Sequence, residues 1–112
     1  MEVPLSSTRT HGGLVFVSGQ VGRDPSTGEV PPSFGDQARI AISNLRRALE
    51  SEGASLSSVL KTTVFITAQE RFAEMNEVYA QSFEEPYPAR TTVVSGLARP
   101  GLEFEIEAIA HL

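Results

Sequence analysis

The 112-residue sequence predicts an α+β fold, a sandwich in which one mixed β-sheet carries two helices on one face. Runs rich in β-branched and aromatic residues alternate along the chain with two segments of helical periodicity. Short links join them in the order β-β-(β)-α-β-α-β-β. The brackets mark a third strand that the sequence permits but does not require. A single domain is expected over residues 1–112. Because the helices cover one sheet face only, another copy of the chain is expected to cover the second face.

The first two strands are predicted on either side of a glycine pair. Residues 14–17 (LVFV) follow Gly12-Gly13, a pattern typical of a hairpin turn that leads into a buried strand. Residues 24–28 (DPSTG) then have proline and glycine where a reverse turn uses them. The chain is therefore expected to fold back near residue 26.

The first helix is predicted to begin after Ser33. Apolar residues recur there at steps of three and four: Phe34, Ala38, Ala41, Leu45 and Ala48. Ser33 and Asp36 have the spacing of a capping box, and Gly53 can adopt the left-handed conformation that ends a helix. The apolar stripe is expected to pack on the sheet.

The second helix is predicted to follow a strand at residues 59–67. Thr67 and Glu70 repeat the capping-box spacing. One side of this helix is then lined by Phe72, Met75, Tyr79 and Phe83. Prolines at positions 86 and 88 are expected to end it.

Two further strands are predicted at about residues 89–94 and 102–110. Alternation along the last strand places Glu103, Glu105 and Glu107 on one face and apolar residues on the other. Three carboxylates on one strand face usually indicate contact with solvent. If this strand lies beside the one that carries Arg90, however, Glu105 could orient a water as a general base.

Composition and charge exclude several classes of function. The formal net charge of −5 and the scattered basic residues argue against nucleic-acid binding, and glycine loops of nucleotide-binding spacing are absent. Without cysteine, and with only the isolated His11 and His111, no metal site is expected. No run approaches the ~20 apolar residues that cross a bilayer, so a soluble, cytoplasmic protein without membrane contact is expected.

Five segments resemble the signature blocks of the RidA/YjgF family, in order and at similar separations. They are residues 14–20 (LVFVSGQ), 61–65 (KTTVF), 75–79 (MNEVY), 88–92 (PARTT) and 105–110 (EIEAIA). The resemblance implies a chorismate-mutase-like fold and a homotrimer with clefts between subunits. It also implies hydrolysis of reactive 2-imino and 2-enamino acids, such as 2-aminoacrylate, to 2-keto acids and ammonia, without a cofactor.

The same resemblance implies the site residues. In the family, the arginine of the Pro-Ala-Arg block holds the substrate carboxylate, and it corresponds to Arg90, whose planar guanidinium suits a bidentate contact. The first glutamate of the Glu-Ile-Glu-Ala block is linked to water activation and corresponds to Glu105. Further substrate-binding positions correspond to Ser18, Gly19, Asn76 and Thr92.

The sequence departs from the family pattern at two places. Many members have tyrosine after the N-terminal proline, where this chain has Leu5 after Pro4, and residues 95–101 also differ from the common link. These departures leave open a carboxylate-binding or regulatory trimer without useful catalysis. The ribonuclease activity ascribed to some relatives is disfavoured by the acidic charge balance.

Overall fold

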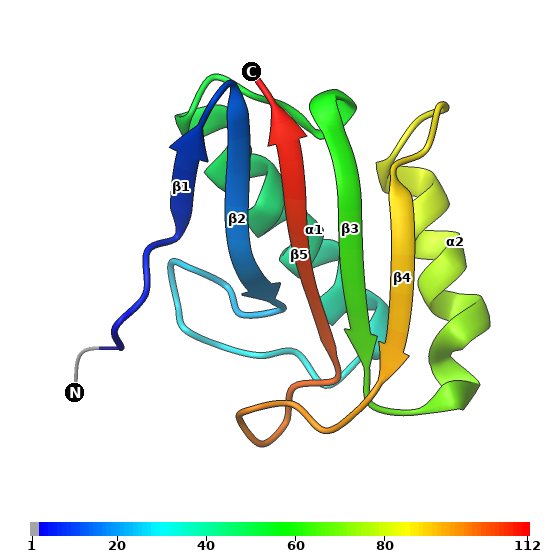
Figure 1. Ribbon diagram of the computed structural model, residues 1–112. Helices are drawn as coiled ribbons and strands as arrows, with labels where there is room; N and C mark the ends of the chain where they lie inside the picture. Colours follow the sequence, from blue (N-terminus) through cyan, green and yellow to red (C-terminus); the bar gives the residue numbers. More distant parts are fainter. Residues whose placement is uncertain (1–2) are drawn as a thin grey trace.

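The computed structural model describes residues 3–112, which form a five-stranded mixed sheet with both helices packed behind it (Figure 1). The strands are β1 (Thr8–His11), β2 (Leu14–Val21), β3 (Val59–Ile66), β4 (Ala89–Val94) and β5 (Phe104–His111), and the helices are α1 (Phe34–Ser51) and α2 (Phe72–Ser82). The sheet order is β1-β2-β5-β3-β4. Only β3 and β4 run parallel; the other neighbours are antiparallel. The predicted α+β fold class is confirmed.

The opening hairpin forms as the glycine pair predicts. Gly12 and Gly13 both have positive φ, which non-glycine residues rarely adopt, and they join β1 to β2. The reverse turn near residue 26 is also present, since Asp24 N donates to Glu29 O at 2.9 Å. The bracketed third strand does not occur between residues 22 and 33. Pro31 and Pro32 lack the N–H donors that a paired strand requires.

Helix α1 begins and ends as expected. Asp36 N donates to Ser33 Oγ at 3.3 Å, while the Asp36 carboxylate binds Arg39 at 3.0 Å. Ser33 therefore caps the helix, and Asp36 contributes to an exposed ion pair. Gly53 has a φ of +83° directly after the C-terminal turn. The helix buries one polar residue that the apolar pattern did not predict, Gln37.

The predicted start of the second helix is wrong. A 3₁₀ turn at Gln69–Arg71 intervenes after β3, and α2 begins only at Phe72, with no side-chain cap. The expected Thr67 cap is therefore not formed. Met75, Tyr79 and Phe83 are buried, but Phe72 is 46% exposed, so it does not belong to the core side.

Strand alternation separates a core face from an open face of the sheet. Phe104, Ile106, Ala108 and Ala110 of β5 are buried against the helices, together with Val15 and Val17 of β2 and Val64 and Ile66 of β3. The opposite face has no cover within residues 3–112 and retains apolar side chains, such as Phe16 at 41% exposure. No helix in this part of the chain is long and apolar enough to span a membrane.

Candidate functional site

Arg90 lies on the core face of the edge strand β4, with its guanidinium against α2. Its strand partner in the register is Thr62, which is fully buried. The Arg90 Cζ atom is 4.8 Å from the Tyr79 ring centroid and 5.9 Å from that of Phe72. Arg90 Nη1 is 3.7 Å from Met75 Sδ. The guanidinium thus rests on aromatic and thioether groups, which attract a cation without neutralising it.

A cavity of about 430 Å³ opens beside this guanidinium. It is lined by Asn76, Tyr79, Ala80, Tyr87, Pro88 and Arg90. Asn76, half-buried on α2, therefore lines the same cavity as Arg90. Thr92 lies two residues further along β4 and lines a neighbouring cavity of about 460 Å³ with Phe72 and Val94. The structure thus places three predicted site residues on one side of the β4–α2 region.

Gly19 and Glu105 meet on the open face of the sheet. A Cβ atom built on Gly19 would lie 1.9 Å from Glu105 Oε2, so only glycine leaves room for the carboxylate in this position. Burial raises the pKa of the Glu105 carboxyl, and the nearby Glu107 charge raises it further. Glu105 is therefore a carboxylate that binds a proton more readily than an ordinary surface glutamate.

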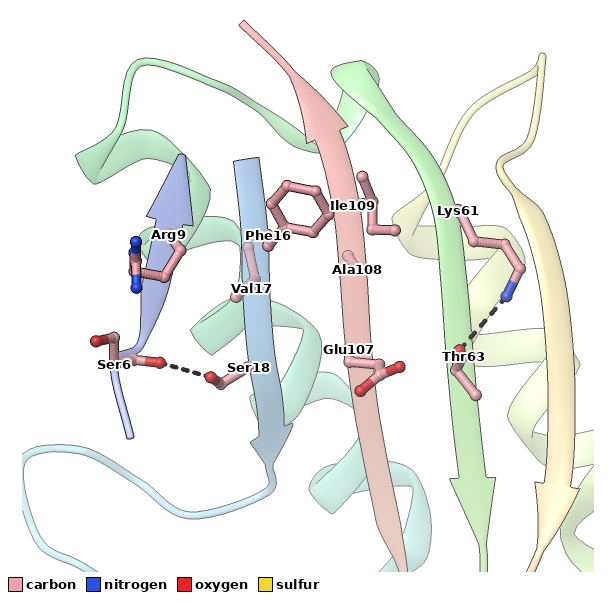
Figure 2. A pocket seen from close by; sticks show the side chains of 10 residues that line it. All are labelled: Ser6, Arg9, Phe16, Val17, Ser18, Lys61, Thr63, Glu107, Ala108 and Ile109. Carbon is pink, nitrogen blue, oxygen red and sulfur yellow. Dashed lines mark hydrogen bonds between the residues drawn. The ribbon is translucent and has the colours of Figure 1, made fainter. Parts of the chain in front are cut away.

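Ser18 forms contacts within the N-terminal part of the chain. Its Oγ donates to Ser6 O at 2.5 Å, and its backbone N donates to Ser7 O at 2.9 Å. Ser6 and Ser18 line a cavity of about 310 Å³ on the open face, together with Lys61 and Glu107. Figure 2 shows the Ser6–Ser18 hydrogen bond among these lining residues. In this structure Ser18 ties the segment that carries Leu5 to β2.

The two groups of predicted site residues lie on opposite faces of the sheet. Strand β3 separates β5 from β4, so the condition set for a joint role of Glu105 and Arg90, that their strands are neighbours, is not met within one subunit. In the register, Glu105 pairs with Phe65 while Arg90 pairs with Thr62. Three residues along β3 correspond to about 10 Å, and two strand spacings add about 9 to 10 Å across the sheet. One subunit therefore does not bring both side chains to the same small molecule.

Comparisons with known proteins show the family and the fold to which the chain is similar. The family model described as Endoribonuclease L-PSP matches residues 2–112. The chain belongs to the RidA/YjgF/L-PSP family. It is 42% identical over 102 residues to the Escherichia coli K12 protein named "Putative reactive intermediate deaminase TdcF", covering 88% of this chain and 79% of that relative. A RutC family protein from Pyrococcus horikoshii is 44% identical over 110 residues, covering 96% and 86% of the two chains.

Solved structures of RidA-family proteins have the same fold. RidA from the Antarctic bacterium Psychrobacter sp. PAMC 21119 matches with a TM-score of 0.94 at 36% identity, covering 98% of this chain and 89% of that one. Escherichia coli TdcF with bound serine matches with a TM-score of 0.92 at 38% identity, covering 100% and 91%. The RidA/YjgF resemblance read from the five sequence blocks is thereby confirmed.

Sequence reasoning missed Gln37, a buried residue that supports the candidate site from the interior. Gln37 Nε2 donates to Pro31 O at 2.9 Å and Gly101 O at 3.0 Å, and its Oε1 accepts from Glu103 N at 2.9 Å. This amide fixes the entry to β5 two residues before Glu105. A buried glutamine on an otherwise apolar helix face was the signal that could have revealed it. Residues 3–112 contain no group of three His, Cys, Asp or Glu side chains that could hold a metal ion.

Proposed function

We propose that this protein is a deaminase that hydrolyses reactive 2-imino and 2-enamino acids, such as 2-aminoacrylate, to 2-keto acids and ammonia. We further propose a homotrimer whose active clefts join the Arg90 side of one subunit to the Glu105 side of its neighbour. The observation that carries the proposal is the division of the predicted site between two faces of one sheet. Family membership supports the reaction class.

The ligand chemistry follows from Arg90. A guanidinium presents two parallel N–H donors that match a carboxylate, and Arg90 has no carboxylate within 4.0 Å among residues 3–112. In a chain with 14 acidic residues, an arginine without such a partner is available for an external anion. The structure of TdcF with bound serine, a small amino acid with a carboxylate, supports the same ligand class here.

Glu105 supplies the proton transfers in the proposed reaction. Its carboxylate accepts a proton from water as the water oxygen bonds to the imine carbon, and the imine nitrogen gains a proton. The resulting carbinolamine then loses its C–N bond, the nitrogen leaves as ammonia with a further proton, and the hydroxyl becomes the keto oxygen. An enamino acid first gains a proton at C3 and loses one from its nitrogen, which converts it to the imine. The raised pKa of Glu105 favours a group that both accepts and returns protons.

The open face supports assembly. Phe16 is 41% exposed and lies opposite Ile109 in the β2–β5 register, so apolar side chains are grouped on a face without a cover in one subunit. Such a patch on a small protein favours contact with further copies. Three copies would bury these faces and bring each Glu105 toward a neighbouring β4 edge.

Mixed trimers test the divided cleft directly. Arg90→Ala and Glu105→Gln subunits are denatured together in equal amounts, refolded, and assayed for ammonia release from freshly generated 2-aminoacrylate. If each cleft takes Arg90 and Glu105 from different subunits, about one quarter of the clefts regain both residues at random mixing. Each variant refolded alone is the control. Mixed samples no more active than these controls would refute the divided cleft.

A carboxylate-binding trimer without catalysis is the competing function. Leu5 favours it, because the family tyrosine at this position is replaced by an aliphatic side chain that is 64% exposed here. The two functions differ in one measurement. A protein that binds pyruvate through Arg90 but leaves 2-aminoacrylate hydrolysis at the uncatalysed rate would be a binding protein.

A further inference from the structure

The Arg90 guanidinium lies against the ring of Tyr79, a buried residue of α2. Its Cζ lies 4.8 Å from the centre of the Tyr79 ring, closer than to any other ring in residues 3–112. Tyr79 is only 5% exposed, and Phe83 stacks on its ring with a centroid separation of 4.5 Å. A guanidinium on such a ring is attracted by the ring quadrupole, and the ring itself cannot shift easily because it is packed in the core.

The Tyr79 hydroxyl is fixed as well. It lies 2.8 Å from Thr62 Oγ1, and the two hydroxyls share a hydrogen bond in the buried interior. Thr62 has no exposed surface and is the direct register partner of Arg90 on the neighbouring parallel strand. Burial raises the pKa of the Tyr79 hydroxyl despite this hydrogen bond, so the phenol stays neutral over the ordinary pH range.

We propose that Tyr79 and Thr62 are positioning residues for Arg90, which hold its guanidinium at the height and angle needed to bind the substrate carboxylate. Thr62 fixes the Tyr79 ring through the hydroxyl bond, and the ring fixes Arg90 through the cation–π contact. This inference rests on the proposed role of Arg90 in carboxylate binding. A long arginine side chain loses considerable rotamer freedom when it binds, so a preformed support improves affinity by reducing that loss.

A simpler interpretation is that Thr62 and Tyr79 only fill the core. Two features argue against packing as their sole role. Apart from the Tyr79 hydroxyl, Gln37 and Thr62 carry the only polar side chains classed as buried in residues 3–112, and the Thr62 hydroxyl bonds to that of Tyr79, whose ring lies against Arg90. In addition, both Tyr79 and Arg90 line the cavity of about 430 Å³ beside α2. The hydrogen-bonded pair Thr62 and Tyr79 thus lies next to the candidate ligand site, and Tyr79 lines its cavity.

Three substitutions distinguish the contribution of the Tyr79 ring from that of the hydrogen bond between Tyr79 and Thr62. Tyr79→Leu removes the ring, whereas Tyr79→Phe and Thr62→Val remove only the hydroxyl bond. The affinity for pyruvate, the keto acid product, is measured by calorimetry so that binding is observed without turnover. Tyr79→Leu is expected to weaken pyruvate binding by about 5- to 30-fold, the range of a partly desolvated cation–π contact. Tyr79→Phe and Thr62→Val should each weaken it by about 2- to 5-fold, and together by no more than either alone.

Matched variants show whether the effect passes through Arg90. Phe72→Leu serves as a graded control, because its ring is farther from the guanidinium, at 5.9 Å, and should matter less. In an Arg90→Ala background, Tyr79→Leu should cause no further loss of pyruvate affinity. An equal loss in that background would overturn the proposal, since Tyr79 would then act without Arg90.

A spectroscopic measurement distinguishes failure of this inference from failure of the proposed function. The Arg90 Nε–H signal in ¹⁵N NMR should be shifted upfield by the Tyr79 ring current, retain the shift in Tyr79→Phe with added line broadening, and lose it in Tyr79→Leu. If Arg90→Ala leaves pyruvate affinity unchanged, the proposed carboxylate role of Arg90 fails. The Arg90 Nε–H signals of the parent and the Tyr79 variants then still show whether the Tyr79 ring holds the guanidinium. If Tyr79→Leu does not fold, the Tyr79→Phe and Thr62→Val pair decides. Unchanged affinity and an unchanged Arg90 signal in both would overturn the proposal.

Discussion

Replacing Arg90 with alanine is the sharpest test of the proposed function. Arg90 is half-buried, and its Cζ lies 4.8 Å from the centre of the Tyr79 ring. The guanidinium has no carboxylate within 4.0 Å in residues 3–112. Its expected partner is the carboxylate of the substrate. Removing one side of such a charge-assisted contact costs about 2 to 5 kcal/mol, so kcat/KM for 2-aminoacrylate should fall roughly 30- to 5000-fold.

The fold should tolerate this change. Arg90→Ala loses the contacts with Tyr79 and Phe72, each worth about 0.5 to 1 kcal/mol at a partly exposed position. The combined loss of about 1 to 2 kcal/mol should lower the unfolding temperature by about 4 to 16 °C, at about 4 to 8 °C per kcal/mol in a domain of this size, and leave the protein folded at 25 °C. The mass measured by light scattering should remain that of the parent protein.

Arg90→Lys separates charge from geometry. An ammonium keeps the positive charge but loses the planar fork, so this variant should recover only part of the lost efficiency. The assays are ammonia release, pyruvate affinity and trimer mass, compared with the parent protein. Near-normal deamination by a folded, trimeric Arg90→Ala protein would refute the carboxylate role. Loss of the trimer would instead identify Arg90 as an interface residue.

Four further predictions concern the other side of the site and the interior. Folding raises the pKa of the Glu105 carboxyl. At pH values above the folded-state pKa, the ionised carboxylate therefore lowers the free energy of unfolding. This destabilisation decreases as the pH falls through the folded-state pKa and is absent below the unfolded-state pKa. Glu105→Gln should therefore be at least as stable as the parent at neutral pH while deamination falls, and a less stable variant in thermal scans would contradict this sign. Gly19→Ala should lower kcat about 10- to 100-fold, because its Cβ would displace the Glu105 carboxylate from a position 1.9 Å away, and it should have no added effect in a Glu105→Gln background. Leu5→Tyr should change the relative rates on small and bulky imino acids, and equal rates throughout would mean that position 5 only packs. Gln37→Leu removes three hydrogen bonds and should cost about 2 to 4 kcal/mol in urea unfolding, whereas Gln20→Leu, which removes one, should cost about 1 kcal/mol.

Local sequence signals predicted most of the fold. Periodicity located both helices and all the strands that form, and the glycines at 12, 13 and 53 correctly marked positions of positive φ. The errors arose where one signal was read without its neighbours. The Thr67–Glu70 spacing matched a capping box, but the chain first makes a 3₁₀ turn at Gln69–Arg71, which moves the helix start to Phe72.

The arrangement of the site depends on strand order, which local patterns do not contain. Alternation correctly predicted that Glu105 faces away from the core. The insertion of β3 between β5 and β4 is a non-local pairing, so the sequence left open whether the strands of Glu105 and Arg90 are neighbours, and in one subunit they are not. The residue blocks that resemble RidA/YjgF proteins predicted candidate site residues but not the faces of the sheet on which they lie.

The division of the site gives its two sides different relations to the core. Glu105 points to the open face while Phe104 and Ile106 on either side of it point into the interior, so its surroundings can change without disturbing packing. Arg90 instead emerges on the core face at the sheet edge, where its neighbours are the buried Tyr79 and Thr62. Substitutions around Arg90 must therefore satisfy both packing and ligand binding. If the proposed function holds, variation in substrate use is expected on the Glu105 side, next to the Ser6–Ser18 contact that ties the segment of Leu5 to β2, while carboxylate binding stays coupled to the stability of the fold.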